Sequence, residues 1–244
     1  MIKYVEGIVL NEKEYGETSK IINVLTKEYG IIGIMSKGCR TLKSQLRSVS
    51  SKLTYGYFNI YYKEGKLSTL ISVDIIDNFK LIKTNFERIS FSTYILELTE
   101  QVTKQNSDEK IYDLCIFSLE KINQGFDPFV ITNILELKYL EYLGVMPILD
   151  CCSICGSTTS ITTISSEKGG YVCKSCYTNE FIVSEKTLKL IRMFNYLDIS
   201  KISKLDIDYN EKKQIDDFLN KYYDQYTGLY LKTKQYIYDI GIKN

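Results

Sequence analysis

Two cysteine pairs with identical spacing are the residues of this chain that are best suited to chemistry. The segments DCCSICGS and YVCKSC supply them as Cys152, Cys155, Cys173 and Cys176. Seventeen residues separate the two pairs, which gives the pattern C-x2-C-x17-C-x2-C. Four thiolates at such a spacing can converge tetrahedrally on Zn²⁺. The pattern predicts one structural Zn²⁺ ion, because four sulfur ligands leave no open position for catalysis.

Other uses of these thiols stay open at the level of sequence. One CxxC pair is enough for thiol redox chemistry, so a redox protein is an alternative, although two matched pairs favour a metal. Cys151 adjoins the first pair and is an alternative ligand. The pattern does not separate Zn²⁺ from another thiophilic metal. Gly169 and Gly170 predict the turn of a hairpin, so residues 150–180 are expected to form a zinc-ribbon-like insertion.

Composition argues against several classes of enzyme. The chain contains no histidine, which removes the usual general base near neutral pH and every histidine-containing metal site. Serine–histidine triads and zinc-protease motifs are therefore excluded. No compact acidic motif offers a place for the two metal ions of a nuclease. We expect a protein that is not an enzyme.

Cysteine usage and hydropathy predict the compartment. The seven cysteines are an odd number, and free thiols persist best where the environment is reducing. No apolar run approaches the roughly 18 residues of a membrane span. Glu6 interrupts the stretch that a signal peptide would need. We expect a cytoplasmic protein without a membrane partner.

Positive charge is concentrated in one segment of the chain. The net charge is only +1, but residues 1–80 hold twelve lysines and arginines against eight acidic residues. Residues 29–63 contain no acidic residue. A polyanion is expected to bind there rather than to the protein as a whole, although a solvated basic loop is the alternative. The basic residues of this segment are Lys37, Arg40, Lys43, Arg47, Lys52 and Lys63.

Five β-branched or aromatic runs, separated by turns, predict strands in the first eighty residues. They are YVEGIVL, KIINVLT, GIIGIMS, LTYGYFNIYY and LSTLISVDII. Five short strands suit a small closed barrel, so residues 1–80 are predicted as a five-stranded OB-fold, with an SH3-like barrel as the alternative. Alternation in YGYFNIYY predicts one face with Phe58, Ile60 and Tyr62, and another with Tyr55, Tyr57 and Tyr61.

The apolar period becomes helical after about residue 80. Helical spacing recurs in residues 91–102, 111–122, 188–194 and 215–222. Asp127 and Pro128 predict the start of a helix that runs to about Gly144 and is apolar over so wide an arc that it should be buried. Ser184 predicts another helix cap. The fold class is therefore predicted as α+β, with a helical domain over residues 81–244 that contains the cysteine insertion.

Several stretches of the chain match motifs of a known family. They include GIVL, YGETSKI, TKEYG, and SKG with Arg40 and Ser44 after it. Further on, LELKYLEYLGVMPILDCCSICG contains Pro147 and places Gly156 directly after Cys155. In this order the motifs resemble the RecO family of bacterial recombination mediators, and the resemblance covers essentially the whole chain.

The resemblance implies an N-terminal OB-fold, a helical domain and a zinc module. It also implies a DNA repair and recombination mediator, associated with the nucleoid, that binds single- and double-stranded DNA and anneals complementary strands. The implied partners are the C-terminal tail of SSB and RecR, with RecA loaded indirectly. Some members lack the cysteines. Near the C-terminus the family often has a histidine and Leu-Lys-Ser, whereas this chain has Leu231, Lys232 and Thr233.

The expected DNA ligands lie in the basic segment. Lysine and arginine bind phosphates by displacing counterions, without reading sequence. The segment is a Ser-rich connection between two strands, and such loops bind nucleic acid in OB-folds. Tyr57 is predicted to stack on a base. An RNA-binding or transcription-associated factor is the alternative in the binding class. The predicted phosphate ligands are Lys37, Arg40, Lys43, Arg47 and Lys52.

Overall fold

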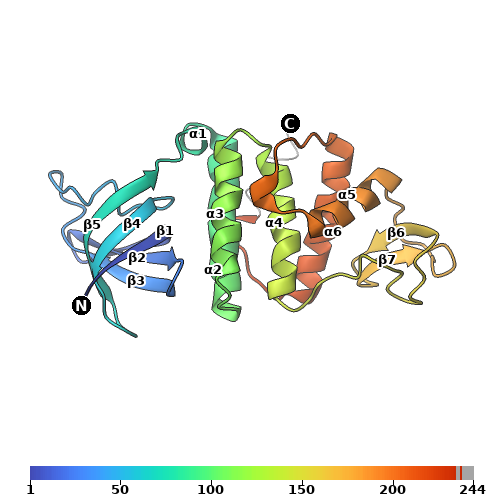
Figure 1. The fold of residues 1–244 in the computed structure, drawn as a ribbon, viewed down its shortest axis with the longest axis horizontal. Coiled ribbons are helices and arrows are strands. Elements are labelled where there is room, and N and C mark those ends of the chain that lie inside the picture. The colour runs from blue at the N-terminus through green and yellow to red at the C-terminus, as the bar shows by residue number, and fades with distance from the viewer. Residues whose placement is uncertain (235–236, 238–244) are drawn as a thin grey trace.

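The runs of β-branched and aromatic residues near the N-terminus form the five strands of a closed barrel. The computed structural model describes residues 1–234 and residue 237, with the barrel at one end, the helices in the middle and the cysteine hairpin at the other end (Figure 1). The barrel strands are β1 (Ile2–Tyr15), β2 (Ser19–Thr26), β3 (Gly30–Ser36), β4 (Tyr55–Tyr61) and β5 (Ser68–Asp77).

The strand order of the barrel is that of an OB-fold. The order is β1-β2-β3-β5-β4, and β1 pairs with β4 to close the barrel. All neighbouring strands are antiparallel except β3 and β5, which are parallel. Gly56 permits the close approach of β4 to β5, because a Cβ atom there would lie 2.4 Å from the Asp74 carbonyl oxygen. The predicted five-stranded OB-fold is confirmed.

The alternation predicted for β4 is confirmed for the residues that point into the barrel, but not for every residue on the outer face. Phe58 and Ile60 are fully buried inside the barrel, while Tyr57 and Tyr61 are exposed on its outer face. Tyr55 shares that outer face in the prediction, but it is buried and stacks on Phe79 with the ring centroids 5.8 Å apart. Tyr55 is buried because the helical part of the chain packs over this end of the outer face.

Outside the barrel and the cysteine hairpin the described chain is mainly helical, and the longer helices lie where apolar spacing predicts them. Asp127 caps the central helix by accepting hydrogen bonds from the N–H groups of Phe129 and Val130, and Ser184 caps another by accepting from Thr187. No helix in the described ranges is both long and apolar enough to cross a membrane. The helices are α1 (Lys80–Lys83), α2 (Phe86–Gln105), α3 (Lys110–Asn123), α4 (Pro128–Tyr142), α5 (Glu185–Tyr196), the 3-10 helix η1 (Ile199–Lys201) and α6 (Tyr209–Tyr226).

Helix α4 is buried around most of its circumference, as its apolar sequence predicts. Eleven of its fifteen residues are buried. It contacts α2, α3, α5 and α6. Its apolar side chains belong to one continuous core that reaches the barrel strands through residues such as Ile8 and Leu10, while a separate cluster fills the barrel interior. The barrel and the helices are therefore packed against each other, not joined by a free linker.

A carboxylate bridges the junction between the barrel and the helices. Glu6 on β1 accepts a hydrogen bond of 2.8 Å from the Tyr55 hydroxyl and one of 3.0 Å from the Tyr112 hydroxyl on α3. Burial raises the pKa of Tyr112 far above its ordinary value, so this hydroxyl keeps its proton and acts as a donor. The three side chains fix the angle at which the barrel meets α3.

Replacing Tyr112 with phenylalanine should weaken this junction. The Tyr112→Phe variant keeps the ring and removes a hydroxyl that donates to a carboxylate, so we expect the unfolding free energy to fall by about 1.5–3 kcal/mol. Urea unfolding followed by circular dichroism measures the loss. Tyr142→Phe, on α4 and outside the junction, is the control and should change stability by less than about 0.5 kcal/mol. Equal stability of Tyr112→Phe and the wild type would contradict the bridging role.

Candidate metal centre and nucleic-acid interface

A short hairpin positions the two cysteine pairs. Strands β6 (Ile161–Ser165) and β7 (Gly170–Cys173) are antiparallel, and the second pair begins at the end of β7. The segment before the first pair lies beside the turn, because Ile148 donates to the Gly169 carbonyl at 3.0 Å and accepts from Tyr171 at 2.9 Å. Only glycine fits at position 170, where a Cβ atom would lie 2.2 Å from the Ile148 oxygen. The predicted hairpin with its glycine turn is confirmed.

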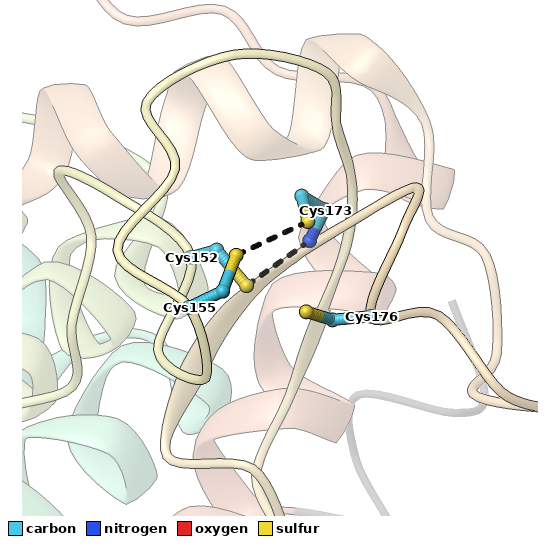
Figure 2. A group of neighbouring side chains, drawn as sticks. All are labelled: Cys152, Cys155, Cys173 and Cys176. Carbon is cyan, nitrogen blue, oxygen red and sulfur yellow. Dashed lines mark hydrogen bonds between the residues drawn. The ribbon is translucent and has the colours of Figure 1, made fainter.

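The four thiols of the pattern meet at one point. Figure 2 shows their sulfur atoms facing one another, and the Sγ atoms of Cys152, Cys155, Cys173 and Cys176 all lie within 4.8 Å of each other. The sulfurs of Cys155 and Cys173 are 3.7 Å apart. A tetrahedron with Zn–S bonds of about 2.3 Å has edges of about 3.8 Å, so the arrangement fits a tetrahedral metal. It does not fit disulfides, whose sulfurs are about 2.05 Å apart.

Backbone N–H groups favour ionisation of the Cys152 thiol. The Cys173 N–H donates to the Cys152 sulfur at 3.4 Å, and Gly156 has a φ of 74°, which closes the turn after the first pair. Burial acts to raise the pKa of the Cys152 thiol, but the N–H groups of Cys155 and Cys173, with that of Ile154, outweigh it and lower this pKa to about 6. The backbone around Cys152 therefore favours the thiolate form of this side chain.

The second pair shows why the four thiols would not all ionise without a cation nearby. A hydrogen bond to Cys155, together with burial, raises the pKa of Cys176 to about 12. Four thiolates so close together repel one another, so the thiols cannot all ionise unaided. A divalent cation at their centre would supply the missing positive charge and displace the remaining protons. The four sulfur donors therefore fit a thiophilic metal. Cys152, Cys155, Cys173 and Cys176 would hold it and leave no open coordination position.

Cys151, the alternative ligand, is not a member of the cluster that the described residues form. Two other thiols, those of Cys39 and Cys115, are buried in other parts of the fold. Just before the pairs, Asp150 accepts hydrogen bonds from Arg192 at 3.0 Å and from the Tyr196 hydroxyl at 2.8 Å, which fixes the module on α5. Sequence reasoning missed this contact, because no spacing rule links residues 42 or 46 positions apart.

The basic segment connects β3 to β4 and covers one end of the barrel. Leu46 packs against the residues that fill the barrel, and the Ser36 and Ser50 hydroxyls are 2.7 Å apart. The side chains of Lys37, Lys43 and Arg47 are exposed on this connection. Lys52 is half-buried. The connection therefore presents cations on a backbone that is itself held against the barrel.

Arg40 differs from the other basic residues of this connection. Its guanidinium lies 3.0 Å from the Glu14 carboxylate and donates to the carbonyl oxygens of Gly16 and Glu17 at 3.3 and 3.2 Å. Arg40 thus ties the connection to the turn between β1 and β2, and part of its charge is already balanced. No ion pair involves the other four basic residues predicted as phosphate ligands, within the part of the chain that the structure describes.

Tyr57, the predicted stacking residue, is exposed but already has an aromatic partner. Its ring stacks on Tyr4 with centroids 5.0 Å apart and planes 10° from parallel. The Tyr4 hydroxyl donates to Asp74 at 2.9 Å, which holds the pair against β5. One face of the Tyr57 ring is therefore occupied, and 37% of the residue is exposed. A base could stack only on the other face.

Replacing single cysteines tests the metal centre. We expect Cys152→Ser to reduce the metal content from about one ion per chain to near zero and to lower the melting temperature, because a site with three thiolates and a hydroxyl binds zinc more weakly. Plasma mass spectrometry of the purified protein measures the content. Cys151→Ser is the matched control and should keep a full complement of metal. Full metal content in Cys152→Ser would contradict the ligand assignment.

Comparison with known proteins agrees with this architecture. The family described as Recombination protein O N terminal matches residues 1–79, and Recombination protein O C terminal matches residues 83–235. Curated sequences named DNA repair protein RecO are similar along nearly all of the chain. The one from Listeria monocytogenes serotype 4b is 33% identical over 236 residues, which cover 95% of this chain and 92% of that protein.

Two further relatives with the same name give similar coverage. The Bacillus pumilus protein is 34% identical over 236 residues, which cover 95% of this chain and 92% of that protein. The Halalkalibacterium halodurans protein is 32% identical over 244 residues, which cover 97% of this chain and 94% of that protein. Together with the barrel, the helices and the cysteine hairpin, these similarities show that the chain belongs to the RecO family of DNA repair proteins.

Proposed function

We propose that the protein is a non-enzymatic mediator of DNA repair and recombination that binds single- and double-stranded DNA and anneals complementary strands. The observation that carries this proposal is the acid-free connection between β3 and β4, which presents Lys37, Lys43 and Arg47 on an OB-fold of the RecO family. Annealing breaks no covalent bond. It requires two polyanions to be held together while their bases stay free to pair, and exposed cations do this by releasing counterions.

The two parts of the chain are assigned different binding roles. In this proposal the barrel, residues 1–80, binds DNA, and residues 81–244 bind proteins. The resemblance to the family supports the partners: the SSB C-terminal tail, RecR, and RecA indirectly. Work on chromosomal DNA would place the protein in the cytoplasm, at the nucleoid. A preference for RNA over single-stranded DNA would instead favour an RNA-binding or transcription-associated factor.

We also propose that the four-cysteine cluster binds one Zn²⁺ ion with a structural role. Thiolate ligands in a tetrahedral arrangement select zinc over harder cations. Four thiolates and one Zn²⁺ carry a net charge of about −2, which disfavours DNA at that end of the molecule. A redox protein would need one pair to cycle alone, and the grouping of both pairs around one point favours the metal.

Removing the free charges of the connection tests the DNA site. We expect the triple variant Lys37→Ala, Lys43→Ala, Arg47→Ala to bind single-stranded DNA at least tenfold more weakly at low salt. The slope of log Kd against log salt should decrease by about 2, because each phosphate contact to a single strand contributes about 0.7. Fluorescence anisotropy with a labelled oligonucleotide, over a series of salt concentrations, measures both quantities.

The control removes the same charge from the helical part of the molecule. Lys189, Lys201 and Lys204 are exposed on or near α5 and η1, and their triple alanine variant should keep both the affinity and the salt slope. Arg40→Ala is left out because it would also free the turn between β1 and β2. If both triple variants lose affinity equally, binding depends on net charge alone and the site assignment is wrong.

A separate variant tests base stacking. If a base stacks on the free face of Tyr57, Tyr57→Ala should weaken binding of single-stranded DNA by about 1–3 kcal/mol and leave double-stranded DNA binding nearly unchanged. Tyr230→Ala, an exposed tyrosine in the helical part of the chain, is the control. Unchanged affinity of Tyr57→Ala for a single strand would remove Tyr57 from the site, and the phosphate contacts would stand alone.

A further inference from the structure

Several exposed apolar side chains lie together on the outer face of the barrel, beyond the end that the helices cover. Ile2 on β1 is opposite Tyr61 on β4 in the strand register. Tyr4, two residues after Ile2, stacks on Tyr57. Each of these four residues is at least 37% exposed. We call Ile2, Tyr4, Tyr57 and Tyr61 the tyrosine face. Exposed apolar side chains that cluster in this way indicate a binding surface.

The aromatic rings of the tyrosine face are placed to accept a flat ligand. The Tyr4 and Tyr57 rings are 10° from parallel, so a further ring can continue the stack on its outer side. The Asp74 carboxylate accepts from the Tyr4 hydroxyl at 2.9 Å and keeps the pair in place. Tyr61 pairs with no other aromatic ring in the part of the chain that the structure describes. Bases of single-stranded DNA stack on such rings whatever their identity.

The spacing of the rings suits an extended ligand. Tyr57 and Tyr61 point to the same side of β4 and lie four residues apart, which is about 13 Å at ~3.3 Å per residue. Nucleotides of a stacked strand rise about 3.4 Å each, so this distance spans about four nucleotides. One strand can therefore reach both ring positions, and the bases between them stay free to pair.

Positive charge borders the Tyr61 end of the tyrosine face. Lys63 and Lys66 are exposed in the hairpin between β4 and β5. Neither lysine forms an ion pair among the described residues. Glu64 is the acidic residue of this hairpin, so the lysines outnumber it. Lysines beside stacking rings are the combination by which proteins bind single strands without reading their sequence.

A third lysine holds this end of the barrel together. The Lys3 ammonium lies 4.0 Å from the centre of the Tyr29 ring and 4.2 Å from that of the Tyr62 ring. A cation over aromatic faces is stabilised by the rings, and these contacts fix the backbone next to Tyr61. The Tyr61 ring is thereby presented on an ordered strand, so a base that stacks on it loses little affinity to ordering of the protein.

The tyrosine face is separate from the basic connection between β3 and β4. The connection enters β4 at Tyr55, and Tyr61 ends the strand six residues later, about 20 Å away. Annealing requires two strands to be held close together. A chain with two surfaces for nucleic acid can hold one strand on each.

We propose that the tyrosine face binds a second single strand by base stacking while the β3–β4 connection holds the first. One chain then carries both partners of the annealing reaction. The connection contacts phosphates, whereas the face contacts bases, with Lys63 and Lys66 on the neighbouring phosphates. The Tyr57 contact belongs to the second strand. This inference rests on the proposed function and adds to it the site of the second strand.

Counting the bound strands tests this proposal. Native mass spectrometry with a strand of about twelve nucleotides that is not self-complementary gives the number per chain. We expect two strands on the wild type and one on the double variant Tyr4→Ala, Tyr61→Ala. The Kd of the second strand should rise at least tenfold, because two stacking contacts are lost. Annealing of complementary fluorescent oligonucleotides should slow at least tenfold, while the Kd of the first strand changes less than twofold.

Matched variants separate stacking from other causes. Tyr209→Ala with Tyr230→Ala removes two exposed tyrosines of the helical part and should leave both strands bound. Tyr4→Phe with Tyr61→Phe keeps the rings and should also retain both strands. If the alanine pair does not fold, Tyr61→Leu replaces it, because leucine keeps an apolar side chain without a ring.

Two results would overturn the proposal. In the first, the wild type binds one strand per chain at saturation and still anneals. In the second, the double variant binds two strands and anneals as the wild type does, which would assign the tyrosine face to a protein partner instead. Either result leaves the proposed function standing, whereas a wild type that binds no DNA at all would contradict both.

Discussion

Helix α4 must be covered on almost every side, and the rest of the molecule depends on this constraint. Its buried residues include polar ones, Asn133 and Glu136, as well as the apolar majority. Helices α2 and α3 cover the side toward the barrel, and α5 and α6 cover the side toward the cysteine hairpin (Figure 1). At its start, Asp127 both caps α4 and pairs with Lys212 of α6. The central helix thereby joins the two ends of the protein through one core.

This arrangement separates two kinds of chemistry. The barrel presents the uncompensated cations of the β3–β4 connection, and the cysteine module concentrates thiolates at the opposite end. The Glu6 bridge to Tyr112 fixes the first end on α3, and the Asp150 contacts with Arg192 and Tyr196 fix the second on α5. Both ends are held by a carboxylate that accepts from side chains far away in sequence. In the proposed function, DNA would bind at the first end, and the metal would stabilise the second.

Local patterns were sufficient to predict much of the fold and of the metal centre. The alternation of Phe58 and Ile60 identifies the inner face of a strand, and Asp127 before Pro128 marks a helix start, because each signal depends on neighbours in sequence. The spacing of the four cysteines predicted a cluster that the structure forms. Sequence patterns could not predict contacts between residues that are distant in the chain. The burial of Tyr55, the pairing of Arg40 with Glu14 and the stacking of Tyr4 on Tyr57 all depend on how separate elements pack.

The measurement that tests the central proposal most directly is annealing of two complementary fluorescent oligonucleotides coated with SSB, followed over a series of salt concentrations. Energy transfer between the dyes reports duplex formation, and each rate is compared with that of SSB-coated strands alone. We predict that the protein accelerates annealing at low salt and that the acceleration fades as salt rises, because phosphate contacts release counterions. Absence of both acceleration and DNA binding, even at the lowest salt, would contradict the proposed function.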